Sequence, residues 1–228
     1  MKPTVLLFDI DGTLVSTGGA GHRSMVGAFA RVHGAPDVFA DISFAGMTDR
    51  SIARYGLRKC LPTVSEIDID GVLDAYLALL AEEVPKAEGY RVLPGVQALL
   101  ASLAGEARVA IGLGTGNVRR GAEVKLTRGA IYDAFAFGGF GCDAEDRTEL
   151  IRTGAERGAG RLGVPLAECR VVVIGDTPKD IAAARGIGAA CVAVATGSFR
   201  ERDLEAHEPD HVVATLEADG VREMLLRR

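Results

Sequence analysis

The chain has little that would suit it to a membrane or to an oxidising compartment. No stretch of its 228 residues approaches the roughly 20 consecutive apolar residues of a membrane span. We expect no signal peptide, because an apolar strand begins almost at Met1. Its cysteines are few, far apart and without a Cys-x-x-Cys pair: Cys60, Cys142, Cys169 and Cys191. We interpret each as a small buried hydrophobe in a reducing cytosol.

Positive charge is also scarce. The 26 lysines and arginines are outnumbered by 31 aspartates and glutamates, which gives a net charge of −5. That balance argues against nucleic acid or an anionic membrane as a partner, but a small anionic ligand stays possible because the local field of a site can oppose the net charge. The hydrophobic and charged shares, 48% and 25%, are those of an ordinary globular protein. We expect a cytoplasmic location and leave the oligomeric state open.

The first part of the chain reads as one strand followed by helices. The apolar run Val5–Phe8 is typical of a strand buried on both faces. Apolar residues then recur at helical spacing up to Gly34 and again over Val72–Leu80, ending before Pro85, with a shorter helix over Asp49–Lys59 that Thr48 could cap. Residues 16–91 are therefore predicted to be helical, without a strand.

From Pro94 onward, predicted helices alternate with predicted strands. One predicted helix opens at Pro94-Gly95, and three more span about 118–129, 146–162 and 179–186. The strands are Arg108–Gly114, Ala134–Phe137, Arg170–Ile174, Ala190–Ala195 and a short His211–Ala214. Such alternation predicts an α/β fold with a doubly wound parallel sheet. The simplest organisation is an α/β core of residues 1–15 and 92–228, interrupted by a helical cap of residues 16–91.

Two carboxylates follow the first strand directly. Asp9 and Asp11 are two residues apart and followed by Gly12-Thr13, so in a strand they would project to the same side. Like charges side by side at the end of an apolar strand are costly, and a cation or a shared proton must offset them. This strand end is therefore a candidate site.

Two further strands also end in polar residues. One ends in Gly114-Thr115-Gly116-Asn117 and another in Gly175-Asp176-Thr177-Pro178, with Asp180 a little further on. Each cluster alone would pass for an ordinary turn or helix cap. Parallel sheets, however, bind ligands at the carboxyl ends of their strands, so adjacent strands would bring the clusters together.

The combined clusters predict chemistry on phosphate. Four carboxylates without a nearby histidine or cysteine (Asp9, Asp11, Asp176 and Asp180) suit a hard cation, and a small catalytic ion such as Mg²⁺ suits them better than Ca²⁺. Thr115 and Gly116, at the start of a helix, offer a cradle for an anion. These parts together amount to phosphoryl transfer through an aspartyl-phosphate.

The order of these motifs resembles the haloacid dehalogenase (HAD) superfamily of phosphohydrolases. The resemblance rests on Asp-x-Asp-Gly-Thr, a later strand-ending Thr and Gly-Asp-x-x-x-Asp, and it covers the whole chain. The helical insert resembles that superfamily's small cap, and Gly46-Met47-Thr48-Asp49 and Pro94-Gly95-Val96 are similar to the phosphoglycolate phosphatase-like subgroup.

The resemblance implies a role for each motif residue. Asp9 would be the nucleophile and Asp11 the general acid and then base, and because true dehalogenases of the superfamily lack this second aspartate, Asp11 points to phosphate esters. Mg²⁺ would be held by the Asp9 carboxylate, the Asp11 backbone carbonyl and Asp176, with Asp180 acting directly or through water. Thr115 and the N–H groups that follow it, including that of Gly116, would hold phosphate oxygens.

One motif position departs from the family pattern. The family has a lysine before the helix that leads into the strand ending in Gly175, and this chain has Arg147 in that region instead. Arginine can make a bidentate phosphate contact. Lys125 is the alternative, although it lies roughly two turns, about 12 Å, from the start of its helix, which is far for direct contact. Either could also be a surface cation. The insert should act as a lid, with candidate residues His22, Arg23 and Arg50.

The sequence thus predicts a Mg²⁺-dependent phosphomonoester hydrolase acting on a small phosphorylated metabolite, with phosphoglycolate suggested by the resemblance. Two alternatives stay open. A sugar phosphomutase on the same scaffold would need a second phosphate site in the lid, and no clear cluster of cations marks one. A non-catalytic phosphate-binding regulatory protein would fit the missing lysine but not the intact aspartates.

Overall fold

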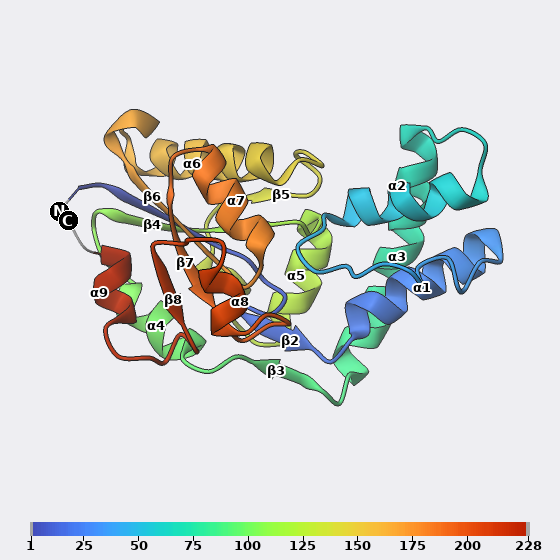
Figure 1. The fold of residues 1–228 in the computed structure, drawn as a ribbon, viewed down its shortest axis with the longest axis horizontal. Helices are drawn as coiled ribbons and strands as arrows, with labels where there is room; N and C mark the ends of the chain where they lie inside the picture. Colours follow the sequence, from blue (N-terminus) through green and yellow to red (C-terminus); the bar gives the residue numbers. More distant parts are fainter. Residues whose placement is uncertain (1, 227–228) are drawn as a thin grey trace.

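Six strands form one parallel sheet at the centre of the computed structural model, which describes residues 2–226 (Figure 1). Their order across the sheet is β5-β4-β1-β6-β7-β8, and every neighbouring pair is parallel. The strands are β1 (Thr4–Phe8), β4 (Val109–Thr115), β5 (Gly138–Phe140), β6 (Arg170–Gly175), β7 (Ala190–Val194) and β8 (His211–Val213). The predicted doubly wound α/β fold is confirmed.

Helices cover both faces of this sheet. Leu6 and Phe8 of β1 face one hydrophobic cluster, and Val5 and Leu7 face another, all of them fully buried. On the first face lie α4 (Val96–Leu103), α5 (Arg119–Thr127) and α9 (Val221–Leu226). On the second lie α6 (Arg147–Leu162), α7 (Pro178–Gly186) and α8 (Glu201–Glu205). Two short 3-10 helices, η1 (Tyr132–Ala134) and η2 (Leu166–Glu168), belong to the connections. A strand buried on both sides explains the unbroken apolar run in the sequence.

The helices of residues 16–91, called here the helical segment, pack on one another at one end of the molecule (Figure 1). They are α1 (Ala20–His33), α2 (Asp49–Cys60) and α3 (Glu66–Lys86). Thr48 caps α2 with a capping box, as the sequence suggested. The predicted end before Pro85 is wrong, because α3 includes Pro85 in its last turn. A proline so close to a helix end removes little of the hydrogen-bond ladder.

The prediction of no strand in this segment is also wrong at its two ends. Strands β2 (Val15–Thr17) and β3 (Tyr90–Val92) pair antiparallel and form a two-stranded ribbon where the helical segment leaves and rejoins the sheet. Each strand has three residues, which is too short to produce an alternating pattern in the sequence. The pairing joins residues far apart along the chain, which local periodicity does not register.

The strand predicted over 134–137 lies instead at Gly138–Phe140. Glycines are poor strand formers, but here they let α6 approach: a Cβ on Gly139 would lie 1.8 Å from the carbonyl oxygen of Leu150. The interpretation of every cysteine as buried is wrong for Cys142, which is exposed in the turn after β5, and Cys60 is only partly buried. Within residues 2–226, no helix is both long and apolar enough to span a membrane.

Candidate active site

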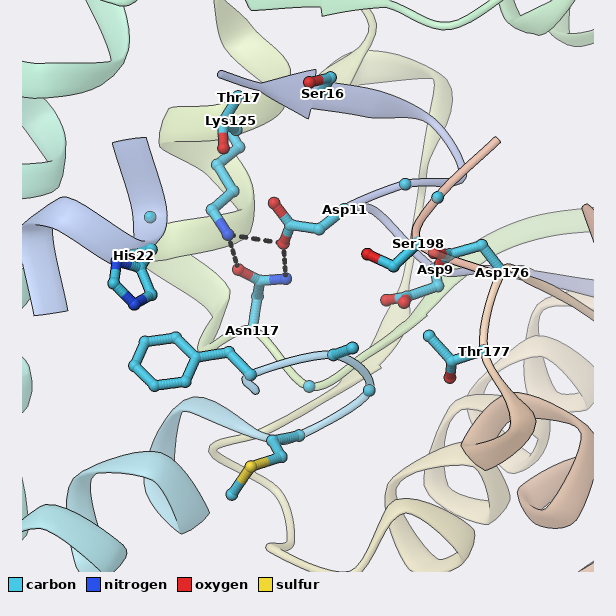
Figure 2. Close-up of a pocket in the computed structure, with 18 of the residues that line it drawn as sticks. Asp9, Asp11, Ser16, Thr17, His22, Asn117, Lys125, Asp176, Thr177 and Ser198 are labelled. Carbon is cyan, nitrogen blue, oxygen red and sulfur yellow. Dashed lines mark hydrogen bonds and ion pairs between the residues drawn. The ribbon is translucent and has the colours of Figure 1, made fainter. Parts of the chain in front are cut away.

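The carboxyl ends of β1, β4 and β6 lie level with one another. Phe8 pairs with Leu113 on one side and Ile174 on the other, and the N–H of Asp9 donates to the carbonyl of Ile174 at 2.8 Å. The predicted adjacency of these three strands is confirmed. The residues that follow the strands line a cavity of about 500 Å³ between the sheet and the helical segment (Figure 2).

Three buried carboxylates meet at this edge. Asp9, Asp176 and Asp180 each place an oxygen within 4.8 Å of the others, and their exposed fractions are 5%, 4% and 0%. Burial raises the pKa of Asp9 to about 6, the nearby charge of Arg147 opposing this rise and that of Asp180 adding to it. Burial also raises the pKa of Asp176 well above its ordinary value. Such a concentration of buried negative charge favours a cation.

The donor set fits a small hard cation such as Mg²⁺. Asp180 is already engaged: one oxygen accepts from Arg147 (3.0 Å from Nε), and the other from the N–H and hydroxyl of Thr177 (3.0 and 2.7 Å). Asp9 and Asp176 have fewer such partners and are the better direct ligands. Asp180 is therefore better placed to act through water, one of the two ways the sequence left open.

Small residues make room for Asp176. A Cβ on Gly12, whose φ is +84°, would lie 2.3 Å from an Asp176 oxygen, and one on Gly197 would lie 1.7 Å from the same atom. The hydroxyl of Thr13 donates to the other oxygen of Asp176 at 3.2 Å. The Gly12-Thr13 turn after Asp11 therefore leaves space for the Asp176 carboxylate and donates a hydrogen bond to it.

Arg147 is the cation beside Asp9. It is the first residue of α6, it is 8% exposed, and its Nη2 lies 2.9 Å from an Asp9 oxygen and 2.5 Å from one of Asp180. Burial alone would lower the pKa of Arg147, but the charges of Asp180 and Asp9 outweigh it and raise that pKa. Arg147 is thus the buried cation next to the carboxylate predicted to be the nucleophile.

Lys125 lies in the same cavity but holds Asp11. Its Nζ lies 2.6 Å from an Asp11 oxygen and 2.6 Å from the amide oxygen of Asn117 (Figure 2). Lys125 reaches Asp11 because helix side chains lean toward the N-terminus and a lysine adds its own length, and direct contact with a phosphate is not needed for this role. The alternative that Lys125 is a surface cation is wrong, because its exposed fraction is 4%.

Asp11 is separate from the three clustered carboxylates. Its side chain is 44% exposed and accepts from the Asn117 amide at 2.9 Å as well as from Lys125. Of the four predicted metal-binding aspartates, the structure brings three together by their carboxylates. The fourth, Asp11, has its carboxylate on Lys125 and Asn117, apart from the other three, which agrees with a role for its backbone carbonyl alone in metal binding.

Thr115 and Gly116 lie beside this network at the end of β4. The Thr115 hydroxyl is fully buried, accepts from the Asn117 amide at 2.9 Å, and its hydrogen bond lowers the pKa of Asp9. A Cβ on Gly116 would lie 2.4 Å from the carbonyl oxygen of Met47. Gly116 is therefore needed for the close approach of the helical segment. Sequence reasoning gave Asn117 no role, although it stood inside the strand-end cluster.

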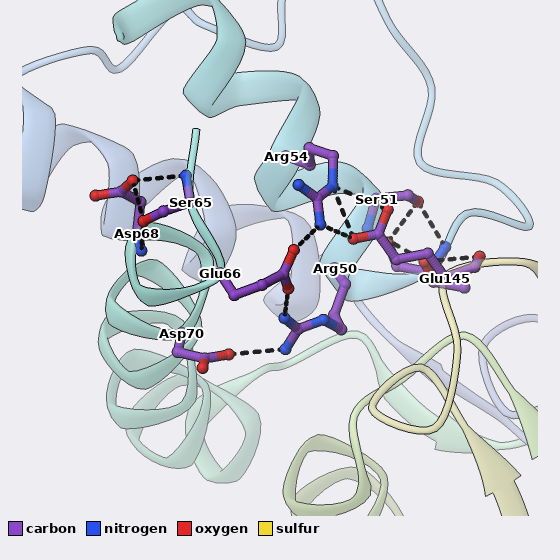
Figure 3. Close-up of polar contacts among 9 residues, drawn as sticks. Arg50, Ser51, Arg54, Ser65, Glu66, Asp68, Asp70 and Glu145 are labelled. Carbon is purple, nitrogen blue, oxygen red and sulfur yellow. Dashed lines mark hydrogen bonds and ion pairs between the residues drawn. The ribbon is translucent and has the colours of Figure 1, made fainter. Parts of the chain in front are cut away.

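Contacts of two residues, Asp49 and Arg54, hold α2 over the strand ends. The N–H of Asp49 donates to the carbonyl of Gly116, and the Asp49 carboxylate accepts from the N–H of Val118 at the start of α5, both at 2.8 Å. Arg54 of α2 makes a forked ion pair with Glu145, which precedes α6 (2.7 Å; Figure 3). The sequence gave no signal for either contact.

The three residues proposed from the sequence for the lid have different positions. His22 lines the cavity. Arg23 instead pairs with Glu83, and Arg50 is engaged by Glu66 and Asp70 on the outer side of the helical segment (Figure 3).

Comparisons with known proteins agree with this geometry. A family model described as HAD-hydrolase-like matches residues 148–218. The probable phosphatase IndB of Dickeya dadantii (strain 3937) is 29% identical, over 100% of this chain and 96% of that protein. The chain is thus similar to HAD-like hydrolases. The resemblance predicted from the sequence motifs is confirmed, and the relative carries the name of a probable phosphatase.

Solved structures share the fold over almost the full length. CbbY of Rhodobacter sphaeroides, solved with phosphate, has a TM-score of 0.71 at 18% identity, covering 96% of this chain and 97% of that chain. A predicted phosphoglycolate phosphatase from Haemophilus somnus 129PT has a TM-score of 0.69 at 17% identity, covering 98% and 97%. At these identities the likeness concerns the fold and not the substrate.

Proposed function

We propose that this HAD-like phosphatase is a Mg²⁺-dependent phosphomonoester hydrolase that works through an aspartyl-phosphate on Asp9. One observation carries the proposal. The Asp9 carboxylate lies against Arg147 and within the cluster formed with Asp176, while Asp11 stands apart in the same cavity, held by Lys125 and Asn117. A nucleophile and a proton donor are thus available to one phosphate ester.

The first half-reaction transfers the phosphoryl group to the protein. An Asp9 oxygen attacks phosphorus, the bond from phosphorus to the leaving oxygen breaks, and Asp11 gives its proton to the departing alkoxide. Arg147 and the buried N–H groups after Thr115 stabilise the charge on the phosphoryl oxygens. Mg²⁺, held by the carboxylates of Asp9 and Asp176 and the Asp11 carbonyl, would neutralise negative charge on the phosphate.

The second half-reaction frees Asp9. Asp11, now ionised, takes a proton from water as the water oxygen attacks phosphorus, and the bond between phosphorus and the Asp9 oxygen breaks. Inorganic phosphate leaves and Asp11 is protonated again. The half-exposed side chain of Asp11 can reach both the leaving group and water, whereas the buried Asp9 is shielded.

We also propose that the helical segment, residues 16–91, is a cap domain that closes over the core, residues 1–15 and 92–228. Its own hydrophobic cluster supports this division. Closure would keep water away from the acyl-phosphate until the alcohol leaves. The phosphoglycolate-like substrate and the cytoplasmic location stay predictions from the sequence.

The test is phosphate release from a panel of phosphorylated metabolites, with Mg²⁺ and with a chelator. We expect release that depends on Mg²⁺ and is lost in Asp9→Asn. A chain that retains full Mg²⁺-dependent activity with Asn at this position would refute the proposal. Release of no phosphate while a phosphorylated substrate is isomerised would instead indicate a phosphomutase.

A further inference from the structure

The half of the cavity next to the helical segment has a composition of its own. Away from Asp9 and Arg147, the side chains that line this half come mainly from α1, α2, α3 and the loop before α2. They are His22, Met25, Phe44, Met47, Asp49, Ile52 and Tyr76. Here the leaving group of a phosphate ester bound at Asp9 would lie. We call this set the leaving-group wall.

We propose that the leaving group is an uncharged alcohol with an apolar or ring-shaped part. The proposal rests on the proposed phosphatase function and names the substrate class for the same site. It departs from the phosphoglycolate-like substrate predicted from the sequence, whose leaving group carries a carboxylate.

The first support is the distribution of cations. Among the described residues that line the cavity, the lysines and arginines are Lys125, Arg147 and Arg91. Lys125 is paired with Asp11, and Arg147 with Asp9 and Asp180. Arg91 is exposed at the rim, on β3. No buried lysine or arginine of the described chain is therefore left to pair with a second anion on the substrate.

The second support is Asp49. This carboxylate is 7% exposed, belongs to the leaving-group wall and is fixed there by the N–H of Val118 at 2.8 Å. A fixed negative charge repels a carboxylate or a second phosphate on the bound ester, and such repulsion is a common means of excluding wrong ligands. An uncharged hydroxyl could instead donate a hydrogen bond to Asp49.

The third support is the size and surface of the wall. The whole cavity of about 500 Å³, which includes the end at Asp9 and Arg147, is within the roughly 300–1,000 Å³ that drug-sized ligands occupy. The rings of His22 and Phe44 lie 4.8 Å apart, and the nearby Met25 and Tyr76 are 1% and 2% exposed. These surfaces would pack against a ring or an apolar chain.

The test compares pairs of esters that differ by one charge-bearing group. Glycerol 3-phosphate is compared with 3-phosphoglycerate, and fructose 6-phosphate with fructose 1,6-bisphosphate, each as a competitor of 4-nitrophenyl phosphate hydrolysis at pH 8 with Mg²⁺. Competition gives an inhibition constant whether or not a probe is hydrolysed. We expect the uncharged member of each pair to bind at least about tenfold more tightly.

For each pair of esters we take the ratio of the inhibition constant of the charged member to that of the uncharged member. Asp49→Asn should reduce both ratios several-fold, because the amide can still accept from Val118 but no longer repels an anion. The matched control is Asp74→Asn, on the exposed surface of α3, which should leave both ratios unchanged. Equal or tighter binding of the charged members, or ratios that Asp49→Asn does not alter, would overturn the inference. No hydrolysis of 4-nitrophenyl phosphate would instead count against the proposed phosphatase function itself.

Discussion

Two buried cations pair with different carboxylates of the site. Arg147 lies against Asp9 and Asp180, and Lys125 lies against Asp11. Arginine's fork suits the first place, where two carboxylates and a phosphate must be reached at once, and a single ammonium suffices for the second. The sequence left open which of the two replaces the family's lysine. We propose Arg147, because it lies beside the proposed nucleophile, whereas Lys125 lies beside the proposed acid.

The separation of Asp9 from Asp11 leads to a prediction for Asp11→Asn. With 4-nitrophenyl phosphate the leaving phenolate needs no proton, so transfer to Asp9 should proceed, whereas hydrolysis of the acyl-phosphate should lose its base. We expect a burst of about one nitrophenolate per protein, followed by turnover slowed about 10²–10⁴-fold. Rapid-mixing absorbance measures both phases.

Asp9→Asn serves as the control for this burst, because without the nucleophile neither phase should occur. If Asp11→Asn turned over at the rate of the unaltered chain and showed no burst, Asp11 would have no part in the second half-reaction.

At the level of elements, α2 and α5 are joined through one buried carboxylate. Asp49 begins α2 and accepts from the N–H of Val118 at the start of α5, where the partial positive charge of the helix favours an anion. Burial nevertheless raises its pKa to about 6, with Lys125 opposing the rise. The junction that places the helical segment over the strand ends is thus sensitive to pH.

The expected consequence concerns stability. Because the pKa of Asp49 is about 6 when folded and 3.8 ordinarily, the folded chain binds more protons between these values, and its stability falls as pH rises through that window. Asp49→Asn lacks this loss. Relative to the unaltered chain, the free energy of unfolding of the variant should be little higher at pH 4 and up to about 3 kcal/mol higher at pH 8.

Urea unfolding at several pH values measures the difference. Asp74→Asn, an exposed change on α3, should show no such trend. A difference between Asp49→Asn and the unaltered chain that stays constant from pH 4 to pH 8 would contradict the raised pKa.

For the molecule as a whole, the sequence predicted what depends on long apolar runs and strand ends. The runs ending at Phe8, Thr115 and Gly175 placed three strands correctly, and the sheet register brings their following residues to one edge. The strands β2 and β3 were missed because each has three residues and pairs far along the chain, and β5 was misplaced because glycines replace strand formers in it.

The site was predictable where a motif carries it and not where distance along the chain hides it. Asp9, Asp176 and Asp180 come together because their strands are adjacent. Lys125 reaches Asp11 across 114 positions by the lean of a helix side chain. Asp49 begins a helix, and the approach of the residues just before it depends on Gly116 having no side chain. Such contacts follow from tertiary packing, which local patterns do not encode.

The central claim is that Asp9 accepts the phosphoryl group. The most direct measurement is peptide mass spectrometry of acid-quenched Asp11→Asn after exposure to 4-nitrophenyl phosphate and Mg²⁺. We predict that the peptide containing Asp9 gains the mass of one phosphoryl group, and that the gain disappears in the double variant Asp9→Asn, Asp11→Asn. Steady phosphate release with no phosphoryl group on that peptide, or a phosphoryl group on another residue, would contradict the account.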